Sequence, residues 1–322
     1  SVRLRLQSDV PLGAFLSGGV DSSLVVGMMR NYFNVPVQTF SIGYDEETYS
    51  ELKYARKVAK HLQTDHNEYI IKPDTPEIWG ELSSKFSEPF GDTSFLPTYY
   101  VSKLAKQHVT VVLTGDAGDE NFGGYEWYKG MELVYRLNKM PVFAKSAFVT
   151  LLSKVPHHHL PFVKKFSGRI NKITGALNET HKNETAVLQA LFGSSVAEVE
   201  RVLSSESNSL MGLEENVLNS RQKILDLYDG DSLVEKVMYG QLMTLLNETF
   251  FVKVDMMSMA NSIEARSPFA DHVLAEHVAK IPFSFKIRNG ETKYILKKIA
   301  EKYIPKDVIY RKKMGFGLPL QE

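Results

Sequence analysis

The sequence predicts an α/β fold, a doubly wound parallel sheet with an α-helical insert. Through the first third of the 322 residues, short apolar runs alternate with helical patterns, which is typical of strands and helices in a parallel sheet. Two of the predicted strands also run directly into glycine-rich turns. Such turns at the carboxyl ends of parallel strands are where α/β proteins bind ligands, so we expect a site there.

The first predicted strand is Leu12–Leu16, an apolar run that ends in Ser17-Gly18-Gly19, and Asp21 then opens a helix. Later elements continue the alternation. Further strands are predicted over Val37–Ile42, Glu68–Ile71 and Val109–Leu113, and helices from Ser50-Glu51 onward and over Ser94–His108. The run Val109–Leu113 is continuously rich in β-branched residues, which indicates a strand buried on both faces.

Residues 126–241 predict a mainly helical insert, because helical patterns dominate there and no alternating strand pattern stands out. The last part, Phe250–Leu320, is dense in motifs. The chain begins at Ser1 rather than at methionine, so we expect a piece of a longer protein.

Composition excludes several function classes. Lys and Arg together number 38 and Asp and Glu also 38, so no net positive field attracts nucleic acid. The absence of cysteine excludes disulfides, thiolate metal sites and a cysteine nucleophile. No apolar run approaches the roughly 18 residues of a membrane span. We therefore expect a cytoplasmic protein that acts on small molecules.

The string Ser17–Ser23 lies between a predicted buried strand and a predicted helix. Two glycines let the backbone approach an anion, and N–H groups at a helix start, with nearby hydroxyls, favour phosphate. The Gly-Lys-Ser/Thr ending of the Walker type is absent, and Asp21 can instead hold magnesium against the phosphates. The alternative is a tight turn without a ligand, which we consider the weaker interpretation.

The segment Thr114–Tyr125 follows the predicted strand Val109–Leu113 and carries four glycines and three carboxylates. An acidic loop at this edge of a sheet tolerates a nucleotide only if a cation neutralises it, so Asp21 and Asp119 predict a shared Mg²⁺. The alternative interpretation is an acidic surface turn.

These motifs carry a resemblance to a known family. Ser17–Ser23 resembles the pyrophosphate loop of ATP pyrophosphatases, and most of the chain resembles the C-terminal synthetase domain of glutamine-dependent asparagine synthetases. The matching segments are Asp9–Ser23, Thr114–Tyr125, Ser258–Phe269, Gly290–Leu296 and Arg311–Leu320. The resemblance implies one domain over residues 1–322, with a sheet of the adenine nucleotide alpha hydrolase-like type, and it implies a ligase.

In that family, ATP activates the side-chain carboxylate of aspartate as a β-aspartyl-adenylate and releases pyrophosphate. Ammonia then displaces AMP and gives asparagine. The resemblance implies ATP and Mg²⁺ as cofactors, aspartate and ammonia as substrates, and an N-terminal glutaminase domain, absent from this chain, as the ammonia source. Free ammonia is the alternative donor if the chain is complete, and we also expect a homodimer.

The resemblance assigns roles to individual residues. Those implied to bind ATP or pyrophosphate are Phe15, Leu16, Ser17, Gly18, Gly19, Asp21, Ser22, Ile42, Thr114 and Gly115, with Mg²⁺ on Asp21 and Asp119. Phe15 and Ile42 would flank adenine or ribose, and Thr114 and Gly115 would contribute backbone groups. The implied catalytic residues are Asp116 in adenylate formation or ammonia admission, Lys293 as a charge stabiliser, and Tyr125.

Two other functions stay open. A related amidotransferase would act on another carboxylate, such as a sugar acid, or close a β-lactam with Tyr125 and Glu248 as the base pair. Met256 bears on this choice, because many relatives have arginine there and the acceptor could differ from aspartate. A catalytically dead ATP-binding scaffold would be expected to lose Asp21, Asp119 or Lys293, and all three are present.

Four further features have mixed interpretations. Arg266 either clamps a substrate anion or pairs with Glu264, and spacing does not decide between these. His157–His159 predicts a solvated linker rather than a metal site. The methionines Met256, Met257 and Met259 predict core packing rather than a soft-metal site. Finally, Arg311–Lys313 predicts contact with ATP phosphates or solvent rather than with DNA.

Overall fold

The computed structural model describes residues 1–33, 36–46, 49–71, 76–129, 131, 141, 219–230, 232–312 and 314. The chain divides into two compact units. One comprises Ser1–Gly124 with Thr244–Glu322, and the other Tyr125–Met243. Within the described ranges, every helix is too short or too polar to cross a bilayer.

The first unit is built on a five-stranded sheet whose pairings are all parallel. In spatial order the strands are β3 (Asp65–Ile71), β2 (Gln38–Tyr44), β1 (Leu12–Phe15), β4 (Val111–Leu113) and β5 (Glu264–Arg266). The central strand β1 pairs with β2 on one side and β4 on the other. Strand order reverses there, which confirms the doubly wound prediction and places the loops after β1 and β4 side by side.

Strand boundaries differ from the prediction where tertiary pairing overrides local pattern. Strand β3 begins at Asp65 rather than Glu68, because it pairs with β2 from Gln38 onward despite its polar start. Strand β4 begins two residues after Val109, whose N–H still bonds to the Ala105 carbonyl at the end of the preceding helix (2.9 Å). The three-residue strand β5 was not predicted, since only its pairing with β4 defines it.

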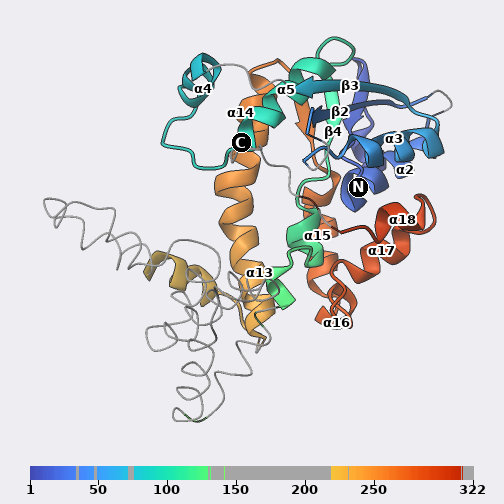
Figure 1. Ribbon diagram of the computed structural model, residues 1–322. Coiled ribbons are helices and arrows are strands. Elements are labelled where there is room, and N and C mark those ends of the chain that lie inside the picture. The colour runs from blue at the N-terminus through green and yellow to red at the C-terminus, as the bar shows by residue number, and fades with distance from the viewer. Residues whose placement is uncertain are drawn as a thin grey trace, which may run out of the picture. The chain divides into compact units, whose positions relative to one another are not determined.

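Helices cover both faces of the sheet. On one face lie α2 (Val20–Arg30) and α3 (Leu52–Leu62), and on the other α5 (Phe95–Ala105) and α14 (Val252–Met259) (Figure 1). Alternate side chains along β2 point to opposite faces of the sheet. Phe40 and Ile42 join the core beneath α5 and α14. Gly43 faces α3, where a Cβ would lie 2.4 Å from the Leu52 side chain.

The remaining elements of this unit are shorter. They are α1 (Val2–Arg5), α4 (Pro76–Ser83), α6 (Gly118–Phe122), the π-helix η2 (Leu245–Phe251), the 3₁₀ turn η3 (Pro268–Ala270), α15 (His272–Ala279), α16 (Phe283–Lys286), α17 (Tyr294–Ala300) and α18 (Lys306–Ile309). The π-helix runs directly into α14. Helix α17 packs on α2. This packing brings the C-terminal motifs to the loop that follows β1.

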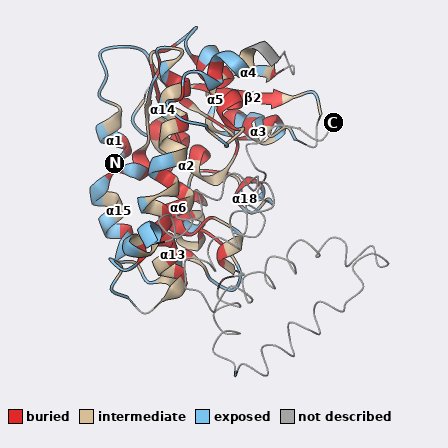
Figure 2. Cartoon of the chain, turned by 90° about the vertical axis from the view of Figure 1, so that its left-hand side faces the viewer, coloured by how far each residue is buried: buried red, intermediate tan, exposed pale blue. Residues whose placement is uncertain are grey.

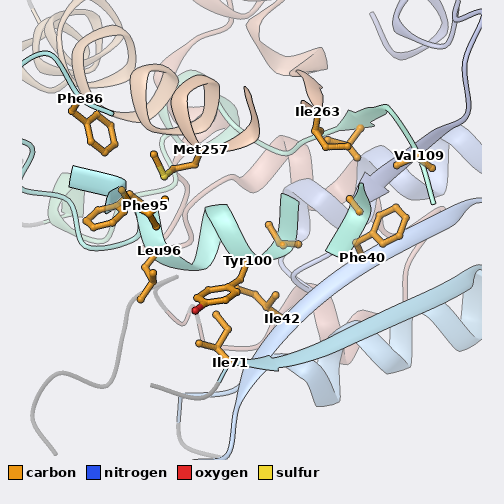
Figure 3. Packing of buried hydrophobic residues seen from close by; sticks show 14 residues of the cluster. Phe40, Ile42, Ile71, Phe86, Phe95, Leu96, Tyr100, Val109, Met257 and Ile263 are labelled. Atoms are coloured by element: carbon orange, nitrogen blue, oxygen red, sulfur yellow. The ribbon is translucent and has the colours of Figure 1, made fainter. Parts of the chain in front are cut away.

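The core between the sheet and the pair α5 and α14 is a continuous apolar cluster (Figure 3). Its members include Phe40, Tyr100, Met257 and Ile263, from β2, α5, α14 and the segment before β5. Figure 2 shows buried residues concentrated along β2 and α2, with exposed residues on α15. Met257 is fully buried, as predicted, whereas Met259 is 55% exposed, which corrects the expectation that it packs in the core.

The second unit has its own packing. The buried Tyr128 donates a hydrogen bond from its hydroxyl to Gln241 on α13 (Leu233–Met243). Leu225 packs against Gly240 of the same helix, where a Cβ would lie 2.7 Å from its side chain. Most of the predicted insert 126–241, with His157–His159, lies outside the described residues, so its helical character stays a prediction.

Candidate active site

The loop after β1 is shaped by its own hydroxyl groups. The Gly19 N–H donates to Ser17 Oγ (3.2 Å), the Ser17 N–H donates to Ser22 Oγ (3.2 Å), and the two hydroxyl oxygens lie 3.0 Å apart. These bonds fold the loop over the start of α2. The first-turn N–H groups of a helix lie outside its own hydrogen-bond ladder. The loop therefore has the shape and the polarity of an anion cradle.

Gly18 is a position that only glycine suits. Its φ is +70°, and a Cβ there would lie 2.6 Å from the Ala55 backbone nitrogen in α3. Arg311 holds the same residue from outside: its Nε donates to the Gly18 carbonyl (3.2 Å). The guanidinium also pairs with Glu51 and lies 4.3 Å from the centre of the Tyr54 ring. Arg311 therefore contacts the loop after β1, and its predicted contact with ATP phosphates stays a prediction.

The loop after β4 approaches the first loop closely, through glycines. A Cβ on Gly115 would lie 2.8 Å from the Ser22 nitrogen, and a Cβ on Gly118 would lie 2.7 Å from the Asp21 carboxylate. Gly118 begins α6, and Asp119 lies in its first turn. These close approaches explain why the acidic loop is also rich in glycine. They bring the Asp21 and Asp119 side chains toward each other.

Lys293 lies between these two carboxylates. Its Nζ is 2.7 Å from Asp119 Oδ1 and also contacts Asp21 Oδ2, and its side chain is only 7% exposed. Burial alone lowers the pKa of this lysine, but the charges and hydrogen bonds of Asp119 and Asp21 outweigh it and hold the pKa above its usual value. The ammonium group therefore stays protonated at neutral pH. The structure brings together Asp21, Asp119 and Lys293, three of the predicted site residues.

The carboxylates of Asp21 and Asp119 are suited to bind a magnesium ion that is also coordinated by nucleotide phosphates. Both carboxylates already share one cation, the Lys293 ammonium, so they are close enough to share a metal. In the part of the chain that the structure describes, no three acidic or histidine side chains gather into a metal cage. Magnesium commonly binds one or two carboxylates and takes its other ligands from phosphate and water.

The predicted contacts of the β4 loop divide between backbone and side chain. The Thr114 N–H is bonded to the Arg266 carbonyl (2.9 Å), so Thr114 can offer a nucleotide only its carbonyl or hydroxyl oxygen. The Asp116 carbonyl accepts from Ser267 Oγ (2.6 Å). The Asp116 carboxylate is half-buried at the same edge of the sheet, in the loop that carries Asp119. Its predicted role in adenylate formation stays a prediction.

Three apolar positions predicted to meet ATP have different environments. Leu16 is 1% exposed, and its N–H bonds to the Phe40 carbonyl (2.9 Å) while its carbonyl accepts from Ser41. Leu16 is therefore a buried support for the loop after β1. Ile42 lies in the core cluster, and Phe15 packs against that cluster while remaining partly exposed. Phe15 is therefore the better placed of the three for direct contact with a nucleotide.

The predicted pair Tyr125 and Glu248 is divided between the two units. Tyr125 begins the second unit, where its ring stacks on Trp127 with centroids 4.1 Å apart. Glu248 is an exposed residue in the first turn of the π-helix of the first unit. A joint role for the two residues stays a prediction.

Of the two interpretations of Arg266, a clamp for a substrate anion or an ion pair with Glu264, the structure shows the ion pair. Its Nε lies 2.6 Å from Glu264 Oε1. Its Nη1 donates to the carbonyls of Arg5 and Gln7, at 2.9 and 2.7 Å. Arg266 thus ties the segment before β1 to the edge strand β5. The hydrogen bond from Arg266 also holds the pKa of Glu264 below its usual value.

A second buried lysine was missed by the sequence analysis. Lys253, in the first turn of α14, lies 3.0 Å from Asp92 Oδ2 and donates to Ser94 Oγ (2.7 Å). Asp92 also accepts from the Ser94 N–H (2.9 Å), just before α5 begins. The available signal was a charge within the apolar run Phe250–Val254. A lysine in such a run is rarely buried without a partner.

Comparisons with known proteins extend this description. A family model described as asparagine synthase matches residues 1–322. The chain is 30% identical over 324 residues to asparagine synthetase [glutamine-hydrolyzing] 1 of Bacillus subtilis, covering 100% of this chain and 48% of that protein. A putative asparagine synthetase [glutamine-hydrolyzing] 2 of Methanocaldococcus jannaschii is 46% identical over 147 residues, 45% of this chain and 28% of that protein.

A differently named relative also matches along nearly the whole chain. The amidase chyE of Penicillium rubens is 24% identical over 356 residues, which cover 99% of this chain and 51% of that protein. The chain spans about half the length of most of these curated relatives. The matches to named synthetases support the prediction of an enzyme of the ligase class.

Proposed function

Because the chain belongs to the asparagine synthase family, we propose that it converts the side-chain carboxylate of aspartate to an amide at the expense of ATP. The observation that carries this proposal is the cluster of Asp21, Asp119 and Lys293 beside the anion cradle of Ser17–Ser22. A cradle, two carboxylates for a metal and a buried cation are what a reaction that releases pyrophosphate requires.

In the proposed binding mode, the β- and γ-phosphates of ATP lie in the cradle at the start of α2. Hydroxyls of Ser17 and Ser22 shape it, and the positive end of the helix favours the anion. Phe15 contacts the nucleoside from the end of β1. Asp21 and Asp119 would hold a magnesium ion, which when bound would neutralise phosphate charge and so favour departure of pyrophosphate.

The chemistry requires two displacements. In the first, a carboxylate oxygen of aspartate attacks the α-phosphorus, the bond to the β-phosphate breaks, and pyrophosphate leaves. In the second, ammonia attacks the activated carbonyl carbon, loses a proton, and AMP leaves with the oxygen that came from aspartate. Lys293 stabilises negative charge as pyrophosphate departs, and Asp116 is the nearby carboxylate for the first step or for receiving the proton.

The adenylate has to be shielded from water while ammonia reaches it, because hydrolysis of the adenylate would consume ATP without forming an amide. The Bacillus subtilis relative is named as glutamine-hydrolysing, and this chain covers 48% of it. We propose that a glutaminase domain supplies the ammonia. A cytoplasmic, homodimeric protein would suit such a biosynthetic role.

The test is a product assay with ATP, Mg²⁺, ammonium and aspartate labelled with ¹⁸O in its side-chain carboxylate. We expect asparagine, pyrophosphate, and AMP that carries one ¹⁸O. Asp21→Asn removes one metal ligand and is expected to lower the rate about 100-fold or more. The control, Asp65→Asn, alters an exposed carboxylate at the start of edge strand β3 and leaves the rate unchanged.

Either of two results would contradict the proposal. ADP with phosphate would show cleavage at the wrong bond, and unlabelled AMP would show that no acyl-adenylate forms. A panel of other carboxylates in the same assay addresses acceptor identity.

A second candidate is amidation of a different carboxylate, with the same site and the same leaving groups. Two observations favour keeping it: Met256 is a neutral side chain packed against the apolar cluster, and the relative chyE is named an amidase. AMP formation with another carboxylate, and none with aspartate, would favour this candidate.

A further inference from the structure

Lys293 occupies the position between Asp21 and Asp119 that the proposed function gives to magnesium. We infer that Lys293 is an exchangeable counter-ion, which holds the two carboxylates in the absence of nucleotide and moves to the phosphates when Mg·ATP binds. This inference rests on the proposed function, since it concerns the same site. It adds that the metal enters with the nucleotide rather than before it.

The contacts of Lys293 are those of a built position. Its Nζ contacts both carboxylates, with 2.7 Å to Asp119 Oδ1. The side chain runs against Gly124, where a Cβ would lie 2.1 Å from Lys293 Cε and 1.9 Å from Asp119 Oδ1. Any side chain at Gly124 would therefore displace the lysine or the carboxylate. The ammonium group is guided to this place by the shape of the loop.

The backbone at Lys293 fits a side chain that must be aimed. Lys293 lies in the left-handed region with φ +54° and immediately precedes α17. This conformation is uncommon for a residue other than glycine, and such strain is typical of functional positions. The Lys297 N–H bonds to the Lys293 carbonyl (2.8 Å), so the backbone is anchored in α17 while four methylene groups let the ammonium group move.

The charges explain why an exchange depends on nucleotide. One ammonium group bridges the two carboxylates that would also hold the metal. A magnesium ion that arrives without nucleotide would have to displace Lys293 from the carboxylates while no phosphate is present to bind the lysine. When ATP is present, its phosphates offer the lysine a new anionic partner, and both cations gain. Lys293 therefore lowers metal affinity until a nucleotide arrives.

The experiment measures Mn²⁺ binding by electron paramagnetic resonance in the absence of nucleotide. Lys293→Met keeps the length of the side chain and removes its charge. We expect the variant to bind Mn²⁺ at least about tenfold more tightly than the wild type, because the two carboxylates lose their competing cation. Mg²⁺ should also raise the melting temperature of this variant and leave that of the wild type nearly unchanged.

The matched control is Lys297→Met, one turn further along α17, where the lysine pairs with Glu291 at 3.3 Å instead. It should bind Mn²⁺ as the wild type does. Lys293→Arg keeps a cation in place and should also resemble the wild type, and it tests the inference if Lys293→Met does not fold. Equal Mn²⁺ affinity in Lys293→Met and the wild type, or tighter binding by Lys293→Arg, would overturn the inference.

A further arm separates this inference from the proposed function. The wild type is titrated with Mn²⁺ in the presence of α,β-methylene-ATP, which cannot release pyrophosphate. Tight ternary binding is expected. If no ternary complex forms, the proposed use of ATP fails, whereas the nucleotide-free comparison of Lys293→Met with the wild type tests the counter-ion alone.

Discussion

Lys293 and Lys253 are both buried beside carboxylates, and they differ in the number of carboxylates that they contact. Lys253 has one carboxylate partner, Asp92, and the hydroxyl of Ser94. Lys293 has two carboxylate partners, Asp21 and Asp119. Lys253 lies at the start of α14, a helix that leads into a parallel strand, and Lys293 contacts the segments that follow β1 and β4, so both lysines lie at the carboxyl edge of the sheet.

The difference separates a structural ion pair from a site that needs a further ligand. The charges of Lys253 and Asp92 cancel, and the pair joins the starts of α14 and α5. Lys293 instead bridges two carboxylates, and this trio lies beside the anion cradle. Ionisable groups gather both in structural ion pairs and at functional sites, so it is the neighbouring anion cradle that distinguishes the trio as a candidate site.

The largest effect is expected for catalysis at Lys293. Lys293→Met should lower kcat for AMP formation by about 10²–10³, because a buried cation aimed at developing phosphate charge is lost. Steady-state kinetics with aspartate and ammonium measure it. Lys297→Met serves as the control and should stay near the wild-type rate. A rate for Lys293→Met within threefold of the wild type would place Lys293 with Lys253, as a structural lysine.

Lys253→Met should instead reduce stability. Removing one partner of a buried ion pair costs about 3–5 kcal/mol when burial is complete. Asp92 keeps its Ser94 hydrogen bonds and its side chain is 23% exposed, so about 2–3 kcal/mol of unfolding free energy is expected. Urea denaturation of the whole chain measures it, and Lys103→Met, an exposed lysine on α5, is the control.

The pH dependence of unfolding free energy, measured for the wild type and for a double variant, tests whether the Lys253–Asp92 pair causes this loss of stability. Burial raises the pKa of Asp92, but the charge of Lys253 and the Ser94 hydrogen bonds outweigh burial and hold the pKa below its usual value. A carboxyl group with a depressed folded-state pKa stabilises the protein above its unfolded value of about 3.9 and loses that contribution as the pH falls further. The double variant Lys253→Met with Asp92→Asn should therefore lose less stability than the wild type from about pH 5 to 3. Parallel profiles would argue against this pair as the cause.

Arg311 is a third cation, and its expected effect is the smallest of the three. It holds the Gly18 carbonyl, Glu51 and the Tyr54 ring at once. Arg311→Lys keeps the charge but cannot make all three contacts, so we expect KM for ATP to rise about tenfold with kcat little changed. The control is Lys312→Met at the exposed neighbouring position. An unchanged KM would show that the loop after β1 keeps its shape without this contact.

Much of the first unit could be predicted from local pattern. Continuous apolar strands and glycine-rich turns indicate a doubly wound sheet because those patterns fit few other structures. The same turns indicated a phosphate site, and Asp21 and Asp119 were expected to share a magnesium ion because carboxylates near a nucleotide need a neutralising cation. Strand β5 could not be found this way, since Glu264–Arg266 is a strand only through its pairing with β4.

The sequence by itself determined the fold class, the two loops and the kinds of side chain that they carry. Spacing along the chain is enough for these, because turn chemistry and hydrophobic periodicity are local properties. Only the tertiary structure decided which partners the cations take. Lys293 contacts Asp21, 272 positions away in the sequence, and Arg311 contacts Gly18, 293 positions away. Such pairings depend on how helices pack on the sheet, and that packing gives Lys253 one carboxylate partner and Lys293 two.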